Sequence, residues 1–374
     1  PVQQGPARLL PPPQRLCAMG ACLARDGKPG PCFYGLVTGT IRVSARAVPR
    51  SVRAIRFVCD TKVPLFMISR EVKVREEVID APHGRLPLEW VLPCAAKEGK
   101  ESPCFKEGAE SPSSGSCGFF SGRGLFRSGD GDLSPSDFSR IMLYLHGGAY
   151  VLCTPGTLRG VTSPLARSVG AALCVPDYRR PPEYTLAAAL EDAMAAYRHV
   201  VERFPKADIY LGGESAGGGL AASMLVALRD SELPPPHAVL LMSPWTDLGG
   251  EGDKAGLRNA SLHNSNIDYL PLDLINMFAG FARGDLPHDS APASPVCAEG
   301  SLAGLPPIFV LYGVNEVLCG QIEHFCEVWR RKGASVRQHG VKGGLHAPLL
   351  FHFCHDDSQQ SLQELEQFFG GADA

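Results

Sequence analysis

The chain has 374 residues, enough for one large α/β core with a smaller accessory region. Hydrophobic residues make up 44% of it and charged residues 20%, which is the composition of an ordinary globular protein. The formal net charge of -3 gives no electrostatic reason to expect nucleic acid or an anionic membrane as a partner.

The cysteine pattern points away from metal and disulfide chemistry. The 13 cysteines are scattered without CxxC or Cys/His spacing, so we expect neither a zinc site nor a disulfide framework. No apolar run reaches the length of about 18 residues that a transmembrane helix needs. We therefore expect a reduced, cytoplasmic protein, although the chain begins at Pro1 without a methionine, which indicates that its natural N-terminus has been removed.

The first part of the chain lacks a regular pattern. Residues 1–31 carry PPP and several glycines, and we predict that they form a disordered tail. Residues 41–48 alternate like a strand, and residues 86–93 (LPLEWVLP) predict an early strand of a sheet. Residues 95–137 are rich in Gly, Ser, Glu and Lys, which predicts a low-complexity surface insertion between two strands.

From residue 140 onward, apolar strand-like runs alternate with helical segments. The predicted strands are 141–145, 172–176, 207–211, 237–242, 307–313 and 335–341. The predicted helices are 157–169, 186–204, 220–228, 321–331 and 358–369. Because each strand is a continuous apolar run, the alternation predicts a mostly parallel sheet with helices on both faces. Such sheets carry their sites at the carboxyl ends of the strands.

A GxSxG motif marks the candidate nucleophile. Residues 213–217 read GESAG, after the strand-like run ADIYL and before a run of helix formers. A serine hydroxyl is a weak nucleophile, so Ser215 has to be held on a sharp strand-to-helix turn where a base can reach it. Small flanking residues let such a turn close. Taken alone, the motif is equally compatible with a Gly-rich turn that has no chemistry.

A second glycine-rich stretch follows the strand predicted at 141–145. His146, Gly147 and Gly148 come directly after this apolar run. Two glycines at that point let the backbone present N–H groups toward a developing oxyanion. A Gly-rich loop is common after a strand, but its combination with Ser215 favours an active site.

Five separated motifs occur in a fixed order along the chain: HGGAY (146–150), DYRRPPE (177–183), GESAGG (213–218), SPWTDL (243–248) and GVNEVL (313–318). In this order they resemble the hormone-sensitive-lipase-like family of α/β-hydrolases, from about Glu89 to the C-terminal helix. The resemblance implies an α/β-hydrolase fold with a small cap. It also implies hydrolysis of carboxylic esters by a triad of Ser, Asp or Glu, and His, without a cofactor.

The resemblance implies an acid that lies between Ser215 and the catalytic histidine in the chain. Glu316 is the leading candidate because it follows the strand at 307–313 by three residues, where a loop can aim it at an imidazole. Asp247 is the alternative acid, although local hydrogen bonding in its turn explains it as well. His346 is the candidate base, because it follows the last strand and two glycines in the sequence GGLHAP.

We expect the other histidines of this region to have structural and not catalytic roles. His339 lies within a predicted strand, and His352 and His355 fall where the last helix should begin. By the resemblance, His146 shapes the oxyanion loop and transfers no proton. The same resemblance implies that the oxyanion hole consists of backbone N–H groups from Gly148, Ala149 and Ala216, with Gly147 as a further donor.

Two residues depart from the family pattern. Ala149 stands where many members have a third glycine, and its methyl group should crowd the site slightly. Glu214 stands where many members have aspartate, and we expect little effect because its side chain does not touch the reacting atoms. In DYRRPPE, we expect Asp177, Arg179 and Glu183 to form an ion-paired network that holds the loop after its strand.

The resemblance divides the chain into a core and a two-part cap. The core is predicted at 81–248 and 291–374, and the cap at 32–80 and 249–290. Within the second part, residues 272–281 are apolar at helical spacing. We expect Met277 and Phe278 to roof an acyl pocket. A helix that only fills a side of the core is the alternative.

The sequence therefore predicts a serine hydrolase with a Ser215, His346 and Glu316 triad and no metal. Its substrate would be a small-molecule ester with a short to medium acyl chain, or a small acylated metabolite, and nucleic acid is not expected as a partner. The alternatives are a non-catalytic small-molecule receptor on the same fold and an amidase or deacetylase with the same triad. The retained His346 counts against a receptor, whereas no motif separates an amidase from an esterase. The oligomeric state is left open.

Overall fold

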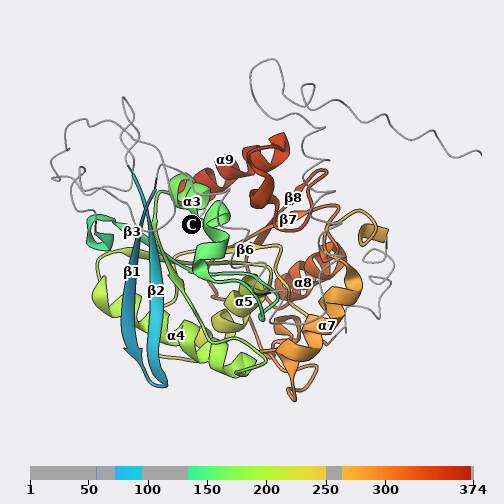
Figure 1. Ribbon diagram of the computed structural model, residues 1–374, viewed down its shortest axis with the longest axis horizontal. Helices are drawn as coiled ribbons and strands as arrows, with labels where there is room; N and C mark the ends of the chain where they lie inside the picture. The colour runs from blue at the N-terminus through green and yellow to red at the C-terminus, as the bar shows by residue number, and fades with distance from the viewer. Residues whose placement is uncertain (1–55, 57–71, 95–133, 250–262, 372–374) are drawn as a thin grey trace, which may run out of the picture.

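The computed structural model describes residue 56 and residues 72–94, 134–249 and 263–371 (Figure 1). The tail expected at 1–31, the strand expected at 41–48 and most of the insertion expected at 95–137 lie outside the described residues. The end of that insertion is described. There Pro135–Asp137 form a short 3-10 helix, in which the Asp137 carboxylate accepts a 2.7 Å hydrogen bond from the Ser134 N–H.

The described residues form one eight-stranded sheet in the order β1-β2-β4-β3-β5-β6-β7-β8. Neighbouring strands from β4 through β3 to β8 pair in parallel, whereas β1 and β2 form an antiparallel hairpin whose second strand pairs antiparallel with β4. The strands are β1 (Val72–Ala81), β2 (Gly84–Pro93), β3 (Arg140–Leu145), β4 (Ala172–Pro176), β5 (Asp208–Glu214), β6 (Val239–Met242), β7 (Ile308–Gly313) and β8 (Val336–Val341).

The sheet confirms the mostly parallel α/β architecture. Each of the central strands β4, β6 and β7 is buried along its whole length, as expected for strands covered on both faces. Each of the strands predicted from 141 onward is present, with ends shifted by at most three residues.

One predicted boundary is wrong. Residues 72–80 were assigned to the cap, but Val72–Ala81 form edge strand β1, paired with β2 from Val72 opposite Pro93 to Ala81 opposite Gly84. Only two of the ten residues of β1 are buried, and its sequence VKVREEVIDA mixes charged with apolar residues. An edge strand of this kind lacks the continuous apolar run by which the central strands were recognised.

Helices cover both faces of the sheet and create two cores. Helices α3 and α9 bury apolar side chains on one face, whereas α4, α5 and α8 do so on the other, and Figure 1 shows these two layers above and below the strands. The helices are α3 (Arg159–Val169), α4 (Leu186–Arg203), α5 (Ala216–Arg229), α7 (Leu272–Arg283), α8 (Cys319–Arg331) and α9 (Asp356–Gly370). The predicted helix at 272–281 is present as α7, which packs against the same core as α4, α5 and α8.

Candidate active site

Ser215 occupies a strained turn between β5 and α5. Its backbone has φ 55° and ψ -121°, a conformation that costs energy for any residue other than glycine. The flanking glycines leave space for this turn. A Cβ at Gly213 would lie 2.4 Å from the Gly217 carbonyl oxygen, and a Cβ at Gly217 would lie 1.9 Å from the Leu145 carbonyl oxygen. The GxSxG spacing is therefore a steric requirement of the turn.

Three predicted residues meet at the carboxyl ends of the strands. The Ser215 Oγ lies 2.8 Å from His346 Nε2, and His346 Nδ1 lies 3.2 Å from Glu316 Oε1. Glu316 and His346 are buried, whereas Ser215 is half-buried. Burial alone would lower the pKa of His346, but the hydrogen bond and charge of Glu316, helped by Asp268 and Glu214, raise it above its ordinary value.

Two hydrogen bonds hold the second oxygen of Glu316. Its Oε2 accepts from the Ser243 hydroxyl at 2.6 Å and from the Gly313 N–H at 2.7 Å. The Ser243 oxygen in turn accepts from the Ala347 N–H at 2.9 Å, which ties the acid to the loop that carries His346. Ser243 belongs to SPWTDL, but its own role was not predicted, because a serine after a strand carries no distinctive signal.

The backbone after β3 supplies free N–H groups. Gly148 has φ 112°, and a Cβ there would lie 2.3 Å from the Leu152 carbonyl oxygen, so the turn requires glycine. Ala149 and Tyr150 follow with φ 54° and 62°. Among the described residues, the N–H groups of Gly148, Ala149 and Ala216 donate to no protein acceptor. They are available to hold a negatively charged oxygen beside Ser215.

Gly147 differs from the other predicted oxyanion donors. Its N–H donates to Glu214 Oε1 at 2.5 Å, so its inclusion in the oxyanion hole is wrong. The same bond changes the interpretation of Glu214, for which we expected little effect. This carboxylate, whose pKa burial raises to about 7, anchors the oxyanion loop to the residue before the nucleophile.

Comparison with known proteins identifies the fold family of the chain. The sequence profile of the α/β hydrolase fold matches residues 142–350. The chain belongs to the α/β-hydrolase fold family. It is 43% identical over 180 residues to an acetyl-hydrolase of Streptomyces hygroscopicus, covering 48% of this chain and 58% of that protein. It is 36% identical over 241 residues to the carboxylesterase/phospholipase LipF of Mycobacterium tuberculosis, covering 63% of each chain.

A solved structure extends the similarity of this α/β-hydrolase to its overall shape. An esterase described as a member of the bacterial hormone-sensitive lipase family superposes with a TM-score of 0.69 at 25% identity, covering 90% of this chain and 96% of the other. This supports the resemblance inferred from the five motifs. The chain spans 56% to 64% of the length of the first three curated relatives.

The alternative acid has a different environment in this α/β-hydrolase. The Asp247 carboxylate is buried and accepts hydrogen bonds from the Gly249 N–H at 2.9 Å and the Ser294 hydroxyl at 3.3 Å. This is the local role considered for it from the sequence. Glu316, not Asp247, contacts His346.

His146 is packed away from the triad. Its ring stacks on Tyr178 with a centroid separation of 4.3 Å, and the Tyr178 hydroxyl donates to the His146 carbonyl at 2.6 Å. Burial, with the nearby positive charge of Arg180, lowers the pKa of His146 to about 4. The ring is therefore neutral at physiological pH, which fits a structural role in the oxyanion loop.

The network expected among Asp177, Arg179 and Glu183 does not form: Arg179 and Glu183 pair with residues outside DYRRPPE, and Asp177 pairs with Arg180 inside it. Arg179 binds both oxygens of Asp192 in α4, and Arg180 pairs with Asp177. Glu183 pairs with Arg56 at 2.8 Å. Arg56 also donates to the Val151 carbonyl at 2.7 Å and the Pro181 carbonyl at 2.8 Å, so it holds the segment after the oxyanion loop. No sequence motif marked Arg56.

Helix α7, which the sequence places in the cap, contributes to the core. Phe278 is buried, and Met277 is half-buried against the same cluster. This packing is expected both for a helix that roofs an acyl pocket and for one that only fills a side of the core. A role of these two residues in an acyl pocket therefore stays a prediction.

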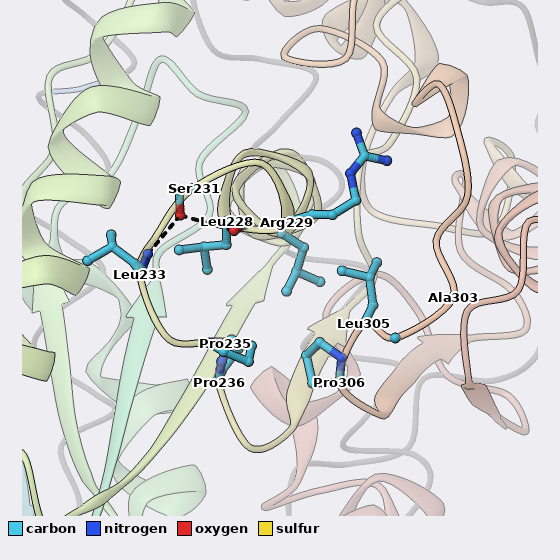
Figure 2. Close-up of a pocket in the computed structure, with 11 residues that line it drawn as sticks. Leu228, Arg229, Ser231, Leu233, Pro235, Pro236, Ala303, Leu305 and Pro306 are labelled. Carbon is cyan, nitrogen blue, oxygen red and sulfur yellow. Dashed lines mark hydrogen bonds between the residues drawn. The ribbon is translucent and has the colours of Figure 1, made fainter.

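Two cavities of this α/β-hydrolase lie away from the triad. One, of about 230 Å³, lies between the end of α5 and the loops before β6 and β7, where Leu228, Pro236 and Leu305 line it (Figure 2). The other, of about 370 Å³, lies against α4 and the β1–β2 turn. Because parallel strands place the triad at their carboxyl ends, the first cavity is at the opposite edge of the sheet. Neither cavity locates the acyl pocket.

The described residues contain neither a cluster of metal-ligating side chains nor a membrane-spanning helix. No group of three or more His, Cys, Asp or Glu side chains in this part of the chain is arranged to hold a metal ion. None of the described helices is long and apolar enough to cross a membrane.

Proposed function

We propose that the chain is a serine hydrolase that cleaves carboxylic esters through an acyl-enzyme intermediate. The observation that carries this proposal is the continuous hydrogen-bonded relay from Ser215 through His346 to Glu316, at 2.8 and 3.2 Å. A serine within hydrogen-bond reach of an imidazole that a carboxylate orients is the arrangement that activates a hydroxyl nucleophile.

The proposed mechanism has two symmetrical halves. Ser215 Oγ attacks the ester carbonyl carbon while His346 Nε2 takes its proton, and the resulting oxyanion accepts hydrogen bonds from the N–H groups of Gly148, Ala149 and Ala216. As the bond to the leaving oxygen breaks, His346 returns the proton to that oxygen, which releases an alcohol. Water then attacks the acyl-enzyme with the same base, and the acid product leaves. Glu316 stays ionised throughout and stabilises the imidazolium.

We propose a substrate with a short to medium acyl chain, or a small acylated metabolite. The support comes from a relative named acetyl-hydrolase at 43% identity and from one named carboxylesterase/phospholipase at 36%. We further propose that residues 263–290 belong to a cap over the site, because α7 packs on the core that contains Tyr150 and Trp245.

A substrate panel tests this function. The purified protein is assayed with p-nitrophenyl esters from acetyl to dodecanoyl, beside aryl amides of the same acids. Ester turnover with a maximum at a short chain is expected. Preferential cleavage of the amides would identify an amidase or deacetylase. Saturable ligand binding without turnover of either series would identify a receptor.

Labelling at Ser215 provides an independent readout. A fluorophosphonate should form a covalent adduct that peptide mass spectrometry places on Ser215, and Ser215→Ala should abolish both the adduct and ester turnover. An active Ser215→Ala variant would show that the reaction uses another residue.

A further inference from the structure

A short segment before α7 contacts both loops of the triad. Asn264 donates through its side-chain amide to the Val314 carbonyl at 3.2 Å and to the Glu316 carbonyl at 2.9 Å. Tyr269 donates its hydroxyl to the His346 carbonyl at 3.1 Å. One end of the segment therefore holds the loop of the acid, and the other end holds the loop of the base.

Asp268 joins the two loops through one buried carboxylate. Its Oδ2 accepts from the Val317 N–H at 2.8 Å, directly after the acid, and its Oδ1 accepts from the His346 N–H at 3.4 Å and the Tyr269 N–H at 2.7 Å. The side chain is only 1% exposed. Because one buried carboxylate binds both His346 and the residue after Glu316, it links the two loops and restrains the distance between them.

The charge of Asp268 also faces the imidazole. Glu316, Asp268 and Glu214 act electrostatically on His346, and each favours the protonated ring. Burial raises the pKa of Asp268 to about 6; the charge of His346 favours its ionised form, and that of Glu316 opposes it. A buried carboxylate near a ring that becomes positive in the reaction stabilises that positive charge more than it would in water.

We propose that Asp268 is a positioning residue of the triad: its carboxylate fixes the Glu316 and His346 loops relative to each other and adds a second negative charge beside the imidazolium. This inference rests on the proposed serine-hydrolase function. Asp268 touches no reacting atom, and it acts through His346.

The test compares Asp268→Asn with the parent protein and with Asp247→Asn. Asp247 is the matched control because it is also a buried carboxylate that accepts a backbone N–H, from Gly249 in its own turn. The measurements are kcat and KM for p-nitrophenyl acetate, the pH dependence of kcat/KM, and the thermal midpoint of each variant.

For Asp268→Asn, we expect kcat to fall by about 10- to 100-fold with KM within about twofold, because misplacement of a catalytic group slows the reaction more than it weakens binding. Loss of the charge lowers the pKa of His346, so the acidic limb of the profile should shift to lower pH by roughly half a unit to one unit. Asp247→Asn should leave that limb at the parental pH.

Tyr269→Phe separates the two parts of the proposal. It removes the hydrogen bond to the His346 carbonyl and keeps the charge of Asp268. We expect a modest fall in kcat with no shift of the acidic limb. A shift in this variant as large as that in Asp268→Asn would contradict the electrostatic part.

The proposal is overturned if the acidic limb of the kcat/KM profile of Asp268→Asn lies at the same pH as in the parent, or if Asp247→Asn shifts that limb by the same amount. Should Asp268→Asn fail to fold, Asp268→Glu decides, since it keeps the charge but displaces it. In that variant kcat must fall while the acidic limb of the kcat/KM profile stays at the parental pH. A kcat equal to that of the parent overturns the positioning role. Activity in Ser215→Ala would instead refute the serine-hydrolase function, so the two failures are distinguishable.

Discussion

Glu316→Gln is the sharpest test of the triad, because the structure dictates how the new amide must orient. Glu316 Oε2 accepts two hydrogen bonds, from the Ser243 hydroxyl and the Gly313 N–H. In the variant, only the amide oxygen can accept from both donors, so it takes the place of Oε2. The amide NH₂ then replaces Oε1 and faces His346 Nδ1, 3.2 Å away in the parent.

This orientation selects the wrong tautomer of His346. An NH₂ donor next to Nδ1 requires that nitrogen to accept, so the proton moves to Nε2, the atom that must take the proton of Ser215. The variant also loses the negative charge that stabilises the imidazolium. Comparable substitution of a triad acid lowers kcat by about 10⁴-fold, which corresponds to about 5 kcal/mol of transition-state stabilisation.

The assay is kcat for p-nitrophenyl acetate in the parent, in Glu316→Gln and in Asp247→Asn, with thermal midpoints to verify folding. Glu316→Gln should fold and lose activity by roughly three to four orders of magnitude, whereas Asp247→Asn should lose less than about tenfold. A folded Glu316→Gln variant within tenfold of the parent would refute the assignment of the acid. The reverse ranking of the two variants would move the acid to Asp247.

Three further outcomes are expected. Ser215→Ala should fold normally and lower ester turnover by on the order of three to six powers of ten, measured with p-nitrophenyl acetate. In the parent, kcat/KM should rise with pH through a midpoint above about 6.5, the ordinary pKa of histidine, because the raised pKa of His346 keeps the base protonated to higher pH. A midpoint below about 6.5 would contradict the raised pKa. Replacing most of residues 95–133 with a short Gly/Ser linker should leave kcat/KM for each acyl-chain length within a few fold of the parent value. Polar substitution at Met277 and Phe278 should instead change the preferred acyl-chain length. The opposite result would show that the insertion, and not α7, covers the pocket.

The three members of the proposed triad could be located from the sequence because each lies within five residues of the end of a recognisable strand. A continuous apolar run locates the end of a parallel strand to within about three residues, and the carboxyl ends of parallel strands meet at one edge. Ser215, Glu316 and His346 come after β5, β7 and β8 in this way. Chain order and motif spacing then separated Glu316 from Asp247, and the hydrogen bond to His346 agrees with that choice.

The supporting residues could not be predicted, because their roles depend on contacts between distant segments. Ser243 lies 73 residues from Glu316, and Asp268 lies 78 residues from His346. A single serine or aspartate in a loop has no periodicity or motif that points to its partner. For Glu214, the motif defined the position, but only the structure shows its hydrogen bond to the Gly147 N–H, which takes that group out of the oxyanion hole.

Backbone strain is concentrated where the triad is assembled. In the described part of the chain, six residues other than glycine have positive φ, and they lie on the loops after β3, β5, β6 and β8: Ala149, Tyr150, Cys153, Ser215, Ser243 and Ala347. Each such conformation costs on the order of 1 kcal/mol or more and persists only where surrounding contacts determine it.

Two of these strained residues are held by the hydrogen bonds that build the site. The Ser243 hydroxyl donates to Glu316 and accepts from the Ala347 N–H, so one side chain fixes the acid and the residue after the base. Because both ends of this link are buried, water cannot replace either hydrogen bond without opening the core. The energy stored in the loops is therefore balanced by the same contacts that orient Glu316 and His346, which explains why the strain is found at this edge of the sheet.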